Sequence, residues 1–129
     1  MTTRILIIED NLDIRENAME LLELAGYSVL TAADGKNGME MAKAELPDII
    51  LCDIMMPYMN GHEVFAELKN YTPTKAIPFI FITSSVERKE IEEALAKGAE
   101  GYVKKPFEEK ELIDTIQKCC LNGRPSGLG

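Results

Sequence analysis

Five short strand-like runs recur along the chain, and the clearest of them are apolar at every position. A half-buried strand alternates apolar and polar residues, whereas a strand covered on both faces, as in a parallel sheet, reads as a continuous apolar run. This pattern therefore favours a sheet enclosed between layers of helices. The predicted strands are residues 4–8, 28–32, 49–52, 78–83 and 101–103.

A segment with the apolar spacing of a helix follows each predicted strand. Gly26, Pro47 and Gly98 stand where three of these segments end, and Asp34 is placed to cap the second. Strands that alternate with helices pair in parallel through right-handed crossovers, which predicts an α/β domain of five strands and five helices, with helices on both faces. Met39, Ala42 and Leu46 are expected to face inward, and Leu112, Ile113, Ile116 and either Cys119 or Cys120 to share one face. The other residues that mark the helices are Ile14, Ala18, Leu21, Leu22, Ala25, Val64, Phe65, Leu68, Ile91, Ala94 and Leu95.

The composition argues against several classes of protein. Fourteen Lys and Arg against 22 Asp and Glu give a net charge of −8, which disfavours binding to nucleic acid or to anionic membranes. The three cysteines have no framework spacing, so they indicate reduced thiols and a cytoplasmic protein rather than a secreted disulfide scaffold. The sequence shows neither the features of a signal peptide nor an apolar run long enough to span a membrane.

The chain of 129 residues has the length of a single ordinary domain. We expect that domain to cover residues 1–121. The remaining residues, 122–129, are rich in Gly and turn-forming residues. Three origins are compatible with them: a frayed end, a linker toward a further domain, or an expression remnant.

Polar side chains follow four of the predicted strands, at the edge where ligands bind in parallel sheets. Glu9 and Asp10 follow the first strand, and Asp53 follows the third. Thr83 ends the fourth strand, and Lys105 comes after the fifth. Clustered carboxylates repel one another unless a cation lies among them, and Mg²⁺ prefers such oxygen ligands. A carboxylate beside that metal can attack phosphorus and form an aspartyl phosphate, with an ammonium and a hydroxyl group contacting the phosphate oxygens.

Each of these residues also has an ordinary explanation. A single Asp after a strand is usually a turn or cap residue, Glu9 and Asp10 can favour a helix N-terminus, and Lys105 alone can be a surface charge. Their joint placement at the ends of four strands favours the chemical interpretation. His62, the only histidine, allows no histidine metal cluster and is expected to be exposed, whereas Cys52 is expected to pack in the core.

Several segments taken together carry a resemblance to a known family. They are Glu9-Asp10 after the first strand, the run 47–57 around Asp53, Asn60-Gly61, the run 80–83, and the run 98–107. Over residues 4–121 the sequence resembles the response-regulator receiver domain of two-component signalling, similar to the chemotaxis regulators. The resemblance implies a flavodoxin-like, doubly wound parallel sheet with strand order 2-1-3-4-5.

The resemblance also implies a role for each site residue. Asp53 would accept a phosphoryl group from a phosphohistidine, and Lys105 would pair with that group. Asp10, Asp53 and the backbone carbonyl of Met55 would ligate Mg²⁺ directly. Glu9 would act mostly through a metal-bound water.

A conformational switch is implied as well. The bond between Lys105 and Pro106 would be cis. Thr83 would move toward the phosphoryl group, and Tyr102 would turn inward into the space that Thr83 leaves. That movement would change the face formed by the fourth helix, the fifth strand and the fifth helix, by a shift between pre-existing states. Met55 and Ser85 would flank the site and tune the rate of dephosphorylation.

In this interpretation the partner is a sensor histidine kinase or a histidine phosphotransfer protein, and the response passes to an output domain or a downstream protein. A homodimer formed on phosphorylation is a further expectation, whereas direct contact of this domain with nucleic acid or a membrane is not expected. The protein would not be a conventional enzyme, since it assists its own phosphorylation and dephosphorylation. The alternative is a receiver-like interaction module that works without phosphorylation. A flavodoxin-type cofactor binder would need a phosphate loop where Glu9-Asp10 stands.

Overall fold

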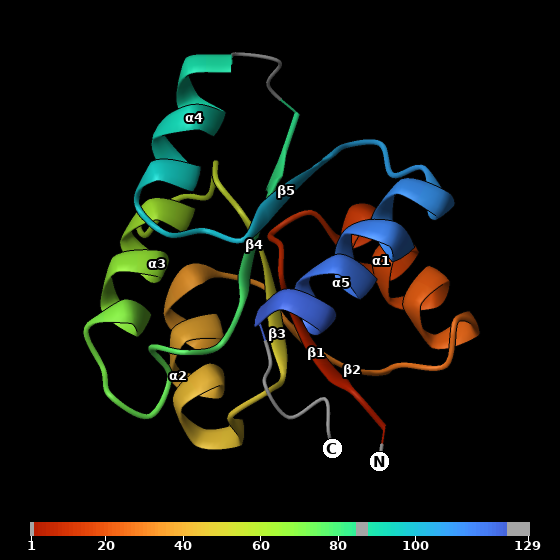
Figure 1. Cartoon of the computed structure of the whole chain (residues 1–129), viewed down its shortest axis with the longest axis horizontal. Helices are drawn as coiled ribbons and strands as arrows, with labels where there is room; N and C mark the ends of the chain where they lie inside the picture. Colours follow the sequence, from red (N-terminus) through yellow and green to blue (C-terminus); the bar gives the residue numbers. More distant parts are fainter. Residues whose placement is uncertain (1, 85–87, 124–129) are drawn as a thin grey trace.

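The computed structural model describes residues 2–84 and 88–123. Its centre is a five-stranded parallel sheet with the order β2-β1-β3-β4-β5 (Figure 1). The fold class and the strand order are therefore those expected from the sequence. The strands are β1 (Arg4–Ile8), β2 (Ser28–Ala32), β3 (Ile49–Asp53), β4 (Phe79–Thr83) and β5 (Gly101–Lys104). The helices are α1 (Leu12–Leu24), α2 (Gly35–Glu45), α3 (Gly61–Lys69), α4 (Arg88–Ala96) and α5 (Glu109–Gly123).

Helices cover both faces of the sheet, with α1 and α5 on one side and α2, α3 and α4 on the other (Figure 1). Each face has its own apolar core, because successive side chains of a strand point to opposite faces. In β1, Leu6 and Ile8 belong to the core beneath α2 and α3, whereas Ile5 and Ile7 belong to the core beneath α1 and α5. All four of these side chains are fully buried, which explains why the strands read as continuous apolar runs.

The helix ends follow the expected local chemistry. The Asp34 side chain caps α2 and accepts a hydrogen bond from the backbone N–H of Asn37 at 2.8 Å. Gly26 follows the end of α1 with a φ of 98°, and Gly98 follows α4 with a φ of 111°. Both glycines stand in the left-handed region that other residues avoid, so they end the helices as predicted.

One position expected to face inward is wrong. Leu46 is 48% exposed because it is the C-cap of α2, with a left-handed φ of 47° that turns the chain out of the helix. Ala25, the C-cap of α1, and Leu95, next to the end of α4, mark their helices as predicted but are exposed. The side chains of Ile91, Ala94 and Cys120 lie outside the described residues, whereas Cys119 is buried.

The predicted boundary at residue 121 stays a prediction. Helix α5 runs to Gly123, and residues 124–129 lie outside the part that the structure describes. Among the described residues, no helix combines the length and the apolar character needed to cross a membrane.

The contact between α2 and β1 leaves no room for a side chain at Gly38. A Cβ atom there would lie 2.5 to 2.7 Å from side-chain carbons of Ile8. Ile8 is fully buried and directly precedes Glu9. The close packing of α2 on Ile8 therefore holds the end of β1, and with it Glu9, in place.

We expect the substitution Gly38→Ala to lower the free energy of unfolding by about 1–3 kcal/mol, because overpacking against Ile8 outweighs the gain in helix propensity of about 1 kcal/mol. Urea titration followed by circular dichroism would measure this difference. Glu40→Ala, at an exposed position of the same helix, is the control and should stay within about 0.5 kcal/mol of the wild type. A Gly38→Ala protein as stable as the wild type would contradict this account of the α2 contact.

Candidate functional site

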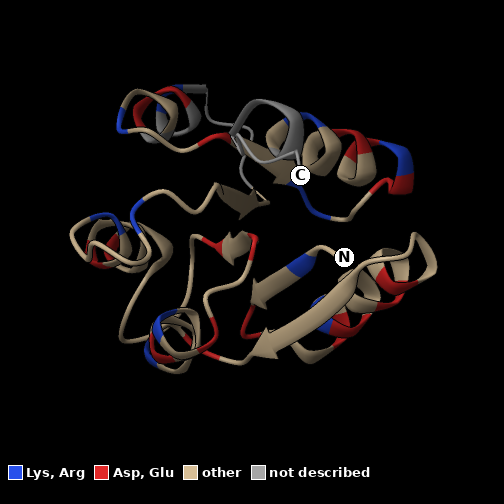
Figure 2. Cartoon of the chain, turned by 60° about the horizontal axis from the view of Figure 1, so that its bottom comes forward, with Lys and Arg blue, Asp and Glu red and all other residues tan. Residues whose placement is uncertain are grey.

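Three carboxylates meet at the carboxyl edge of the sheet. Glu9 and Asp10 follow β1, and Asp53 ends β3. One carboxylate oxygen of each lies within 4.8 Å of the others, and we call these three residues the acid cluster. Acidic segments stand beside the ends of the central strands in Figure 2. Glu9 and Asp53 are buried, with exposures of 0% and 2%, whereas Asp10 is exposed.

The sheet register brings the acid cluster together. Ile8 of β1 is paired with Cys52 of β3, so Glu9 and Asp53 are the next residues on two neighbouring strands. The chain then turns back tightly, because the backbone N–H of Gly61 donates to the carbonyl of Ile54 at 2.9 Å. A Cβ atom at Gly61 would collide with the Asp53 carbonyl, so glycine is required for this close approach.

Lys105 supplies the positive charge of the site. Its Nζ lies 3.3 Å from Asp53 Oδ1 and 3.4 Å from Glu9 Oε1. The backbone N–H of Lys105 donates to the carbonyl of Thr83 at 3.0 Å, which ties the end of β5 to the end of β4. The bond between Lys105 and Pro106 is cis. From the end of β5, the Lys105 side chain reaches past β4 to the two buried carboxylates of Asp53 and Glu9.

Burial perturbs the acid cluster. Loss of hydration raises the pKa of Glu9 from 4.5 to about 7; the Asn11 N–H opposes the rise, Asp53 adds to it and Lys105 opposes it. Burial likewise raises the pKa of Asp53 above 3.8, against the effect of Lys105. The single Lys105 ammonium therefore does not fully offset the free-energy cost of burying the carboxylates of Glu9 and Asp53. Hard oxygen atoms in such a cluster fit a divalent cation such as Mg²⁺.

The other predicted residues lie around this centre. Thr83 is buried with an exposure of 4%, Tyr102 is 39% exposed, and the Met55 side chain is 75% exposed. In β4 and β5, Thr83 pairs with Lys104 and Phe81 with Tyr102, so Tyr102 lies one pleat away from Thr83 on the same face. Ser85 lies outside the described residues.

Two further predictions concern His62 and Cys52. His62 was expected to be exposed, and this is wrong: the side chain is half-buried, and its ring packs against Phe81 with centroids 5.1 Å apart. The tight turn at Gly61 holds the start of α3 against the end of β3, where the His62 ring lies on Phe81 of the neighbouring strand β4. Cys52 is fully buried, as predicted, and burial raises the pKa of its thiol.

Sequence reasoning did not identify Asn11 and Arg15, which also shape the site. The Asn11 N–H donates to Glu9 Oε2 at 3.1 Å, while its side chain caps α1. Arg15 Nη1 donates to the carbonyl of Glu9 at 2.8 Å. An Asn before a helix is a recognisable cap signal, whereas nothing in the spacing marks Arg15 as a contact of the preceding loop.

A cavity of about 340 Å³ opens beside the acid cluster. It lies between the loops that follow β1, β2 and β3, and its walls are mostly apolar. This opening leaves one side of Asp10 accessible from solvent. The lining residues are Asp10, Ala33, Asp34, Gly35, Lys36, Pro57, Tyr58 and Met59.

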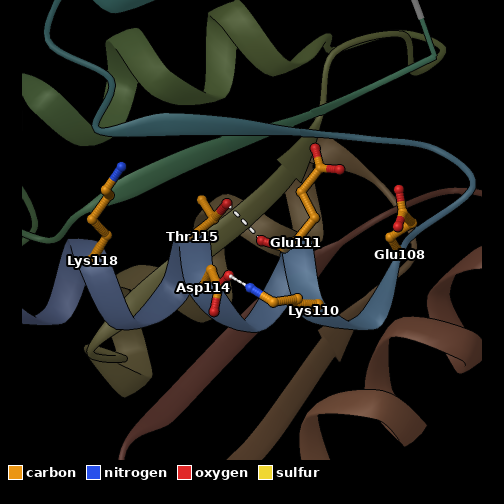
Figure 3. A pocket seen from close by; sticks show the side chains of 6 residues that line it. All are labelled: Glu108, Lys110, Glu111, Asp114, Thr115 and Lys118. Atoms are coloured by element: carbon orange, nitrogen blue, oxygen red, sulfur yellow. Dashed lines mark hydrogen bonds and ion pairs between the residues drawn. The ribbon is translucent and has the colours of Figure 1, made fainter.

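A second hollow lies on α5, far along the chain from the acid cluster (Figure 3). Lys110 Nζ donates to Asp114 Oδ2 at 2.9 Å, and the Thr115 hydroxyl donates to the carbonyl of Glu111 at 2.8 Å. These are the local contacts of an exposed helix face, and they give no reason to assign chemistry there. The lining residues are Glu108, Lys110, Glu111, Asp114, Thr115 and Lys118.

Comparison with known proteins gives the family. The response regulator receiver domain matches residues 5–117 of this sequence. The chain belongs to the response regulator receiver domain family. That match covers β1 from its second residue, the other four strands, every residue of the acid cluster and Lys105.

Individual relatives agree with this assignment. The response regulator SaeR of Staphylococcus aureus is 37% identical over 111 residues, which are 86% of this chain and 47% of SaeR. The chain thus spans about half the length of this curated relative. The structure of the chemotaxis protein CheY4 of Vibrio cholerae superposes with a TM-score of 0.86 at 31% identity, covering 92% of this chain and 98% of that one. A response regulator receiver domain protein from Clostridium thermocellum gives a TM-score of 0.87 at 27% identity, covering 95% and 98% of the two chains.

The raised pKa of Glu9 predicts how the stability of the metal-free protein depends on pH. Between pH 4.5 and about 7 the folded protein keeps a proton on Glu9 that the unfolded chain releases, so stability falls as pH rises through that window. Glu9→Gln removes this cost. In EDTA at pH 8 we expect the variant to be about 1–3 kcal/mol more stable than the wild type, with the difference vanishing near pH 4.

Urea unfolding of both proteins at the two pH values measures the effect. Glu16→Gln, in the exposed part of α1, is the control and should change stability little at either pH. A Glu9→Gln protein that is less stable than the wild type at pH 8 would show that Glu9 gains more from Lys105 than it loses by burial.

Proposed function

We propose that this receiver domain is phosphorylated on Asp53 by a phosphohistidine, in a reaction that requires Mg²⁺. The observation that carries the proposal is the placement of the buried Asp53 carboxylate in the acid cluster, 3.3 Å from the Lys105 ammonium. A nucleophile, a metal-binding set and a cation for the transferred group then stand within one site.

Asp10, Asp53 and the backbone carbonyl of Met55 would hold the ion, with Glu9 acting through a bound water. When bound, Mg²⁺ would neutralise the negative charge that otherwise keeps a phosphoryl group away from the acid cluster. The exposed position of Asp10, beside the cavity, leaves that ligand accessible to an ion from solvent.

In the transfer step, an Asp53 oxygen forms a bond to phosphorus while the phosphorus–nitrogen bond of the phosphohistidine breaks. The electron pair of that bond goes to the imidazole nitrogen of the donor. Lys105 would turn its ammonium from the free carboxylates to the new phosphoryl oxygens, and the Thr83 hydroxyl would donate to another of them. The Lys105 ammonium already lies 3.3 Å from Asp53 Oδ1, so this exchange of partners needs little movement of that side chain.

The same residues suggest how phosphorylation is communicated. As Thr83 moves toward the phosphoryl group, Tyr102, which is 39% exposed and lies on the same face, would turn inward. The face formed by α4, β5 and α5 would change, and a downstream protein, an output domain or a second copy of the domain would recognise it. The donor would be a sensor histidine kinase or a histidine phosphotransfer protein in the cytoplasm.

Phosphorylation of Asp53 is tested with acetyl phosphate and Mg²⁺, followed by intact-mass analysis. We expect one added phosphoryl group in the wild type, its loss with EDTA, and none in Asp53→Asn, because the amide is a far poorer nucleophile than the carboxylate. Asp13→Asn, which makes the same chemical change at an exposed position of α1, should be phosphorylated as the wild type is.

A wild-type protein that stays unmodified under these conditions would refute the proposal. Such a result, with partner binding unchanged in Asp53→Ala, would favour an interaction module that works without phosphorylation.

A further inference from the structure

Hydrogen bonds hold both the backbone and the side chain of Glu9. Its N–H donates to the carbonyl of Ala32 at 3.1 Å, and its carbonyl accepts from Arg15 Nη1 at 2.8 Å. Of its carboxylate oxygens, Oε2 accepts from the Asn11 N–H at 3.1 Å and Oε1 from Lys105 Nζ at 3.4 Å. Residues of β2, of α1 and its N-cap, and of the segment after β5 therefore all hold the turn that carries Glu9 and Asp10.

Arg15 differs from the other partners of Glu9 because its contact comes from a long side chain. It stands in the first turn of α1, where its N–H donates to the carbonyl of Asn11 at 3.0 Å. From there the half-buried guanidinium reaches back over the turn to the carbonyl of Glu9. This bond spans the residues between β1 and α1, including Asp10, and so closes the turn into a loop of fixed shape.

We propose that Arg15 is a positioning residue of the acid cluster, which sets the affinity for Mg²⁺ by holding the turn between β1 and α1. The inference rests on the proposed function, since it concerns the metal of that reaction. Asp10 is exposed and directly follows the Glu9 carbonyl to which Arg15 donates. Loss of that hydrogen bond would let Asp10 move relative to the buried Asp53. Outer groups that orient metal ligands commonly change metal affinity by about tenfold or more.

The influence of Arg15 is geometric. Its Nη1 donates to the backbone carbonyl of Glu9, whereas the carboxylates of Glu9 and Asp53 pair with Lys105. Removing the Arg15 charge should therefore not strengthen Mg²⁺ binding, although a nearby cation would ordinarily compete with the metal. A lysine keeps the charge but has a shorter side chain without the planar fork, so it should restore the contact only in part.

Arg4 offers a matched control within the same chain. Its Nη1 also donates to a backbone carbonyl, that of Glu45, at 2.8 Å. The residue stands at the opposite end of β1 from the acid cluster. Arg4→Met and Arg15→Met therefore remove the same charge and the same kind of hydrogen bond to a backbone carbonyl, one away from the acid cluster and one beside it. Arg4→Met also removes an exposed ion pair with Glu45.

The experiment titrates Mg²⁺ alone into each protein by isothermal titration calorimetry and also measures phosphorylation by acetyl phosphate at saturating Mg²⁺. For Arg15→Met we expect about a tenfold higher Kd for Mg²⁺, for Arg15→Lys about threefold, and for Arg4→Met no change. At saturating Mg²⁺ the phosphorylation rate of Arg4→Met should stay within about twofold of the wild type, because Arg4 stands at the opposite end of β1 from the acid cluster.

Equal Mg²⁺ affinity in Arg15→Met and Arg4→Met would overturn the inference, whatever either substitution does to the melting temperature. Where Arg15→Met fails to fold, Arg15→Lys decides in its place, and wild-type affinity in that variant overturns the inference as well. A wild type that binds Mg²⁺ but takes no phosphoryl group refutes the proposed function and leaves this comparison of affinities intact.

Discussion

The site depends on carboxylates being kept out of water at the end of a parallel sheet. Glu9 and Asp53 end up side by side because β1 and β3 are neighbours in register, and both are buried because helices close over the two faces of the sheet. Their charges cost free energy in that position, which Lys105 offsets in part. The remaining imbalance gives this edge the charge and the oxygen atoms that suit a divalent cation.

Much of the fold could be predicted because the residues that the sheet must bury are the apolar ones that the sequence pattern marks. Strands covered on both faces need apolar residues throughout, and the bounds of β1 and β2 agree with the runs that predicted them. The error came at a helix end, where Leu46 continues the apolar spacing of α2 but is its exposed C-cap. The apolar periodicity of a helix depends on that helix alone, so it does not show where the element packed against it ends.

The candidate site was predictable for a different reason. Residues that follow parallel strands meet at one edge whatever the rest of the chain does, so the grouping of Glu9, Asp53 and Lys105 needed only the order of elements. Contacts that depend on the length and direction of a side chain could not be predicted from the order of elements. Arg15 bonds backward across a turn, and His62 lies on β4 because Gly61 holds the start of α3 against the end of β3.

The two outer strands bear on how copies of the domain can meet. Strands β2 and β5 each have a neighbour on one side, and an unpaired strand edge invites another chain to extend the sheet. Here β5 is four residues long and ends at the exposed Lys104, and β2 begins at the exposed Ser28. A four-residue edge strand that ends in an exposed lysine discourages edge-to-edge pairing at β5. An association between copies would then be expected to use the helical faces, which the proposed phosphorylation would remodel, rather than an extension of the sheet at β5.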